Sequence, residues 1–228
     1  MMNNPRPSIR VNVDVTNPGQ FFACGGLLEL AGRLCPGAKG WFEASSDYYF
    51  CVCFDSPNNP LRHNDLILSF AESDLRNTMS ESQYRRRKEL SMLSKKERVV
   101  LGLEKEKSSL DKLHREAPLI LGEPFHMRLD WFLDNHSGGE KFKTWAGQQS
   151  VLKIALGMKE PIVNGEWDHL LPERWMTKSS EVKSHSFNFD SNLGETGSDL
   201  DLGFSLDPLS MNQQTRPFIE IFAFFGLQ

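Results

Sequence analysis

The chain has 228 residues, of which 39% are hydrophobic and 25% are charged, and its formal net charge is -4. These values are typical of a globular protein with one sizeable core, so we expect a single α+β domain over 1–228. The weak negative charge excludes binding of nucleic acid or membranes through net charge alone, so a basic surface has to be local. No signal-peptide stretch is present and no run approaches the roughly 20 apolar residues of a membrane span, so we expect a cytoplasmic protein without a membrane partner.

Strand and helix signals follow one another near the start of the chain. Apolar and polar residues alternate over 9–15, which predicts a strand with one buried face. Asn17 is a good N-cap and Pro18 suits the first helical position, so a helix is expected from there to Leu34. The Gly25–Gly26 pair costs about 1 kcal/mol per glycine inside a helix, and close approach of another backbone is the simplest reason for it.

The middle of the chain combines strand signals with a charged segment. The aromatic stretch 41–54 around a Ser-Ser-Asp turn predicts a β-hairpin, and the apolar run 66–70 predicts a short strand. Residues 80–116 contain many charges, no proline and only a thin apolar stripe, which predicts a helical insertion with a break at Gly102. This arm either packs through one narrow face or becomes ordered on a partner.

Further strands and helices are predicted towards the C-terminus. Alternation predicts strands over 124–134, 185–190 and 201–209, and apolar residues at helical spacing predict a helix over 146–158. The final apolar stretch predicts a helix capped by Thr215 and followed by Gly226. Because such a helix normally leads into another element, we expect a C-terminal segment to be missing.

Cysteines and histidines show no spacing typical of a metal or catalytic site. Cys24, Cys35, Cys51 and Cys53 lie in apolar stretches, which favours reduced core thiols. The six histidines are scattered, and the motifs of acyl transfer, P-loop and dinucleotide-binding proteins are absent. We therefore expect no catalytic residue, no metal and no cofactor.

Basic residues suggest three surfaces that can contact phosphates. The first is the arm, where Arg85, Lys88 and the Lys95–Lys96 pair would fall near one face of a single helix; a solvated helix surface explains these charges equally well. The second is the polar face of the predicted strands, with Arg10 and Asn12 on the first strand and Arg128 with His126 on the 124–134 strand, near Tyr48 or Tyr49. The third is the start of the 146–158 helix. The candidate RNA-binding residues are Arg10, Asn12, Arg85, Arg86, Arg87, Lys88, Lys95, Lys96, Arg128, Lys143 and Trp145.

Four sequence blocks resemble those of a small CRISPR-associated, Csb-type RAMP-like protein of subtype I-U, later grouped with I-G. The blocks are VDVTNPGQFFACGGLLELAGRL, KTWAGQQSVL, FNFDSN with DLGFSLDPL, and RPFIEIFAFFGLQ. The resemblance implies a ferredoxin-like or RRM-like antiparallel sheet with helices on one face, to which the charged insertion is added. It also implies a non-catalytic crRNA-binding subunit of a Cascade-like antiviral complex, with crRNA, other effector subunits and, indirectly, target DNA as partners. In that family the sequence continues beyond GLQ, so the resemblance implies a shortened C-terminus.

Two other functions remain open. A protein-interaction module would dock on larger subunits through the arm and the C-terminal helix, without contacting RNA. An endoribonuclease would need His63, His126 or His185 beside a tyrosine or lysine.

Overall fold

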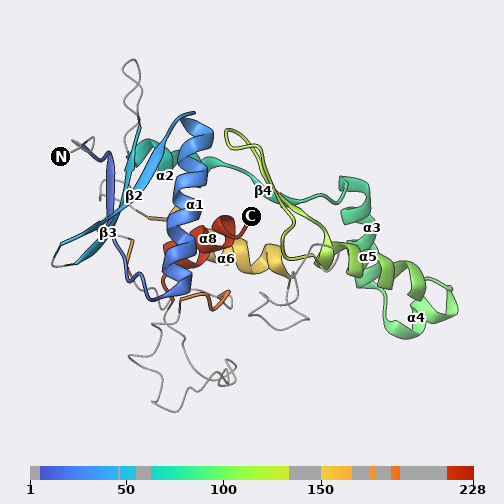
Figure 1. The fold of residues 1–228 in the computed structure, drawn as a ribbon. Coiled ribbons are helices and arrows are strands. Elements are labelled where there is room, and N and C mark those ends of the chain that lie inside the picture. Colours follow the sequence, from blue (N-terminus) through green and yellow to red (C-terminus); the bar gives the residue numbers. More distant parts are fainter. Residues whose placement is uncertain are drawn as a thin grey trace, which may run out of the picture.

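The computed structural model describes residues 6–45, 47–54, 63–133, 150–165, 175–177, 186–190 and 215–228. Over these residues the chain is an α+β protein with two antiparallel sheets of three strands each (Figure 1). Sheet A consists of β1 (Ile9–Asn12), β2 (Lys39–Ala44) and β3 (Tyr48–Cys53), and sheet B of β4 (Leu75–Asn77), β5 (Leu119–Leu121) and β6 (Met127–Leu129). The helices are α1 (Pro18–Leu34), α2 (His63–Glu72), α3 (Glu81–Met92), α4 (Lys95–Val100), α5 (Glu104–Glu116), α6 (Val151–Val163) and α8 (Pro217–Gly226).

Sheet A has the strand order β1-β3-β2, and α1 covers one of its faces (Figure 1). Ile9 and Val11 of β1 are fully buried on that face, as is Leu27 of α1. Phe21 of α1 stacks on Phe42 of β2 with ring centroids 5.8 Å apart, but it remains half exposed. The other face of sheet A carries the alternate residues of each strand.

The first predicted strand is shorter than expected, whereas α1 and the β2–β3 hairpin lie close to their predicted positions. β1 ends at Asn12 and does not reach Val15. The Asp14 carboxylate accepts hydrogen bonds from the backbone N–H and the hydroxyl of Thr16, at 2.9 and 2.6 Å. This local turn ends the extended backbone before the helix begins.

Helices α1 and α8 touch backbone to backbone. A Cβ atom on Gly26 would lie 1.9 Å from the carbonyl oxygen of Phe222, and one on Gly226 would lie 1.9 Å from the carbonyl oxygen of Phe22. The contact is reciprocal, since each glycine faces the carbonyl four residues before the other glycine. The predicted close approach of a second backbone to the glycine pair is therefore confirmed, and so is the predicted C-terminal helix.

Sheet B, with the order β4-β5-β6, is predicted only in part. Of the strand predicted over 124–134, only β6 is extended. A turn precedes β6, in which the Phe125 N–H donates to the Gly122 carbonyl. Another turn follows it, in which the Leu133 N–H donates to the Asp130 carbonyl. The helical arm of α3, α4 and α5 is inserted between the paired strands β4 and β5.

The strand predicted over 66–70 is wrong, because these residues belong to α2. Leu66 and Phe70 lie one helical turn apart and are both fully buried. A short apolar run satisfies strand and helix templates alike, and here packing against the core selects the helix. The Phe70 ring lies 5.4 Å from the Phe222 ring of α8, between centroids.

Helix α6 begins and ends later than predicted. Ser150 caps it, accepting a hydrogen bond from the Lys153 N–H, and the helix continues past Met158 to Val163 because Ile162 is buried on the same side. The residues 146–149, where the helix was expected to start, lie outside the described part of the chain.

Two other predictions near the C-terminus need correction. Residues 186–190 form no strand, because Asn188 adopts a positive φ of 60° that interrupts the extended backbone. The N-cap of α8 is Arg216 rather than Thr215, and Gly226 is the last helical residue rather than the one that follows. The predicted strand over 201–209 lies outside the described residues.

A buried polar cluster joins the N-terminal ends of α1 and α8. The Asn17 side chain caps α1 as predicted, and its amide also donates to Asp190 at 2.7 Å. The other Asp190 oxygen accepts from Arg216, at 3.0 Å. The Glu220 carboxylate accepts from the backbone N–H groups of Phe189 and Asp190. Burial raises the pKa of Glu220 to about 7, with a smaller contribution from the Asp190 charge, while the backbone hydrogen bonds oppose the shift.

Replacing Gly26 with alanine should destabilise the fold strongly. The new Cβ would overlap the Phe222 carbonyl oxygen, so the two helices would have to separate, and we expect a loss of more than about 3 kcal/mol in the free energy of unfolding. Gly32→Ala on the same helix is the matched control. A Cβ there meets no atom within 4 Å, so the higher helix propensity of alanine should increase the free energy of unfolding by up to about 1 kcal/mol. Urea unfolding measures both, and equal effects would contradict the proposed role of the contact.

The buried Glu220 should make stability depend on pH. Its folded-state pKa lies above the ordinary 4.5, so the folded chain keeps a proton that the unfolded chain has released. The contribution of Glu220 to the free energy of unfolding should therefore fall as the pH rises from about 4.5 to about 7, by on the order of 3 kcal/mol, and then level off. Glu220→Gln should flatten this slope, whereas Glu160→Gln, at an exposed position, should retain it. A slope that persists in Glu220→Gln would show that another group causes it.

Candidate nucleic-acid interface

The outer face of sheet A, opposite α1, brings together basic, aromatic and amide side chains. Arg10 and Asn12 of β1 are exposed on this face, as predicted. The Arg10 guanidinium carbon lies 3.4 Å from the centroid of the Tyr49 ring, in a close cation–π contact. Its Nε also lies 3.2 Å from a carboxylate oxygen of Glu43 on β2. Two contacts thus fix the plane of this half-exposed side chain.

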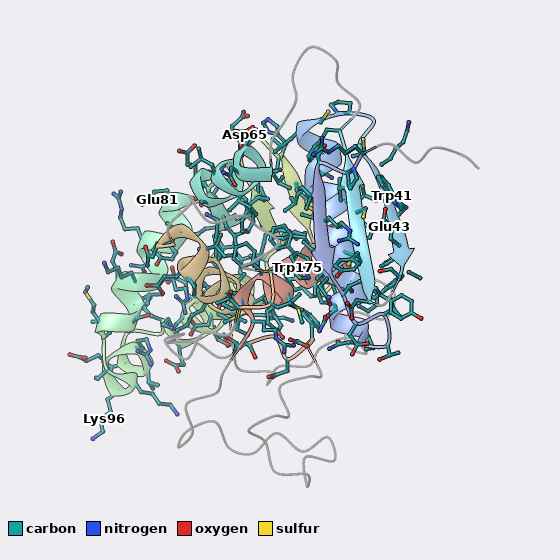
Figure 2. All side chains as sticks on the ribbon, turned by 90° about the vertical axis from the view of Figure 1, so that its left-hand side faces the viewer. Trp41, Glu43, Asp65, Glu81, Lys96 and Trp175 are labelled. Carbon is teal, nitrogen blue, oxygen red and sulfur yellow. The ribbon has the colours of Figure 1, made fainter. Side chains whose placement is uncertain are left out.

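Glu43 of β2 contacts both Arg10 of β1 and Trp41 of its own strand. Its other oxygen accepts a hydrogen bond from the Trp41 indole N–H at 3.2 Å, and Figure 2 labels both residues on β2. The Trp41 hydrogen bond and then the Arg10 contacts lower the pKa of Glu43. Cys51 lies on β3 between Arg10 and Trp41. Burial and the nearby Glu43 charge raise the pKa of its thiol to about 11.

Arg128 does not belong to this face, because β6 is part of sheet B. It is exposed and forms an ion pair with Asp130 at 3.1 Å. Across the sheet, Arg76 of β4 and Arg128 flank Ile120 of β5 in register, and Arg76 pairs with Asp74 at 2.6 Å. The expectation that Arg10 and Arg128 share one sheet is therefore wrong.

Two of the predicted basic residues on α3 are used inside the arm. Arg86 binds both carboxylate oxygens of Glu106 on α5, at 2.8 and 3.0 Å. Arg87 pairs with Asp111 of α5 at 2.9 Å. These contacts hold α3 against α5, and the Glu106 contact is the largest cause of the raised pKa of Arg86. Arg85 and Lys88 remain exposed, Arg85 with a long contact of 3.9 Å to Glu81.

The remaining arm lysines do not continue the α3 surface. The expected break at Gly102 is present, with a φ of 68°, but the arm also breaks after α3, where Ser94 caps the separate helix α4. Lys95 and Lys96 therefore lie on α4, and the prediction of one basic helix face running from Arg85 is wrong. Lys143 and Trp145 lie outside the described residues.

The two groups of candidate residues lie at opposite ends of the molecule. Figure 1 shows sheet A at one end and α4 at the other, and the labels of Trp41 and Lys96 in Figure 2 are likewise far apart. The structure therefore does not assemble the predicted residues into one interface. Sequence reasoning missed Trp41 and Arg76 and left Tyr48 and Tyr49 as alternatives near this face. Strand register is the signal that pairs Tyr49 with Asn12 and Trp41 with Cys51.

Comparisons with protein-family models, curated proteins and solved structures found no match to this chain. Among the described residues, no three or more histidine, cysteine or acidic side chains are grouped as a metal site would require. His126 lies 2.9 Å from the Glu123 carboxylate on the surface. None of the described helices combines the length and apolar character needed to cross a membrane.

The cysteines should be unreactive in the folded protein. All four are buried and none forms a disulfide, and burial raises the pKa of Cys24 to about 12, so hardly any reactive thiolate forms at neutral pH. Iodoacetamide labelling followed by mass spectrometry should give little modification of the native chain and complete modification in urea. Rapid native labelling of Cys51 would show that the outer face of sheet A opens.

Proposed function

We propose that this chain binds single-stranded RNA through the outer face of sheet A, as a non-catalytic crRNA-binding subunit of a type I CRISPR effector complex. The observation that carries the RNA-binding part is the Arg10–Tyr49 stack on a sheet face that also exposes Asn12. The resemblance of four sequence blocks carries the assignment to a CRISPR complex. A ferredoxin-like or RRM-like arrangement is part of the proposal, and the β1-β3-β2 order of sheet A with α1 behind it supports it.

The stacked guanidinium is suited to an unpaired base. Single-stranded RNA is commonly bound by stacking of bases on aromatic rings or on the planes of arginine guanidinium groups. Tyr49 supports one side of the Arg10 plane, and Glu43 holds its Nε, so little side-chain entropy remains to be lost on binding. Asn12, two residues along β1, supplies both an amide donor and an acceptor beside this platform.

The charge distribution of this face favours stacking on RNA bases over neutralisation of RNA phosphates. Glu43 compensates Arg10 directly, so the local field for phosphates is weak. We therefore expect binding with a shallow dependence on salt, since few counterions are released. Exposed Arg85 and Lys88 lie on the distant arm and are not part of the proposed face.

Two substitutions at Arg10 test the role of its plane and its charge. Arg10→Lys keeps the charge but removes the stacking surface, so it should raise the Kd for a labelled single-stranded RNA about tenfold with an unchanged salt slope. Arg10→Glu should raise the Kd further. Fluorescence anisotropy at several salt concentrations measures both quantities.

Arg85→Glu is the matched control, because it reverses an exposed arginine far from sheet A. It should change the Kd by less than about twofold. If Arg85→Glu weakens binding as much as Arg10→Glu, or the wild-type chain binds no RNA, the proposed face is wrong. Co-purification from cells that carry the neighbouring genes, with sequencing of the bound RNA, tests the crRNA part, since repeat-spacer RNA is expected.

A further inference from the structure

The helical arm carries a surface that the RNA-binding proposal does not use. The arm leaves the body between β4 and β5, where the Thr78 N–H donates to the Pro118 carbonyl at 3.0 Å. It extends away from the body on the side opposite sheet A (Figure 1). Its far end, which we call the arm tip, comprises Met92, α4 and the turn to Gly102.

The arm tip exposes large apolar side chains next to one another in the sequence. Val100 is 85% exposed, Met92 76%, and Val99 and Leu101 59% each. A run of three exposed apolar residues is unfavourable in a chain that has no use for it. Methionine is enriched at protein interfaces, and adjoining exposed apolar side chains are typical of a surface that binds another protein.

Specific side-chain contacts hold the arm tip together, so the exposure of its apolar residues does not result from a frayed helix end. The Arg98 side chain, 16% exposed, pairs with Glu104 at 3.0 Å and donates to the carbonyls of Leu90 and Leu93 at the end of α3. Ser94 and Glu97 form a capping box at the start of α4. These contacts join the end of α3, α4 and the start of α5, and they hold Val99 and Val100 outward.

The charge around the apolar residues is positive. Lys95 and Lys96 are exposed at the start of α4, and Lys105 is exposed at the start of α5. The nearby acids do not cancel this charge. Glu104 pairs with Arg98, and Glu97, whose carboxylate accepts from the Ser94 N–H, stands against the three lysines. A partner that binds this surface would therefore bind more tightly if carboxylates surround its apolar contact area.

We infer that the arm tip docks on a protein partner that presents an apolar groove rimmed by aspartate or glutamate. The lysines of two tips would repel each other, which disfavours a second copy of this chain. A short helix with few apolar residues also offers less buried area than membrane-bound amphipathic helices, which disfavours a lipid surface. The inference does not rest on RNA binding, since Arg10 and Tyr49 lie at the other end of the molecule (Figure 1).

Photo-crosslinking from the tip tests this inference in the full chain. Met92→p-benzoylphenylalanine, produced in the native host and irradiated, should form an adduct whose mapped peptide contains apolar residues flanked by carboxylates. Val100→Asp in the same background should abolish the adduct. Val163→Asp on α6, at an apolar position that is 43% exposed, is the matched control and should leave it unchanged.

The purified partner then gives the quantitative test. Val100→Asp should raise its Kd at least about tenfold, and Lys95→Glu with Lys96→Glu should raise it and reduce the salt dependence. Adducts with lipid or with the chain itself, no adduct that depends on Val100, or tighter binding by the lysine variants would each overturn the inference. Circular dichroism should show that Val100→Asp is folded, and its RNA affinity should be unchanged, which separates this result from the RNA-binding proposal.

Discussion

The contact between the backbones of α1 and α8 is the constraint on which the rest of the fold depends. Gly26 and Gly226 each lie against a carbonyl oxygen of the other helix, at a distance that no side chain permits. The approach lets the ring of Phe222 reach Phe70 of α2 and Trp175, the fully buried side chain labelled in Figure 2. Dispersion between closely packed atoms offsets the backbone entropy that the glycines lose on folding.

The same contact explains why sheet A has one buried and one exposed face. Because α1 lies between sheet A and α8, Ile9 and Val11 are buried beneath it and the alternate residues point away. The buried polar cluster of Asn17, Asp190 and Arg216 fixes the two helices at their N-terminal ends. On this scaffold, Tyr49 and Glu43 keep the guanidinium plane of Arg10 in place.

The helical arm places the arm tip far from the outer face of sheet A. Its ion pairs across α3 and α5 are half exposed, so each contributes little to stability, but they determine how the two helices face each other. Arg86 and Arg87 thus orient α3 against α5, with their guanidinium groups paired to Glu106 and Asp111. The exposed lysines and aliphatic residues of the tip remain, at the end of the molecule far from sheet A (Figure 1).

The sequence by itself determined the elements whose signals are local. Asn17 and Pro18 predict the start of α1, the Ser-Ser-Asp turn predicts the β2–β3 hairpin, and the alternation around Arg10 predicts its exposure. Only the tertiary structure decided that 66–70 is helical, that Arg128 lies in a different sheet from Arg10, and that acids of α5 pair with Arg86 and Arg87. Those outcomes depend on partners distant in sequence, and residue spacing within one segment carries no information about them.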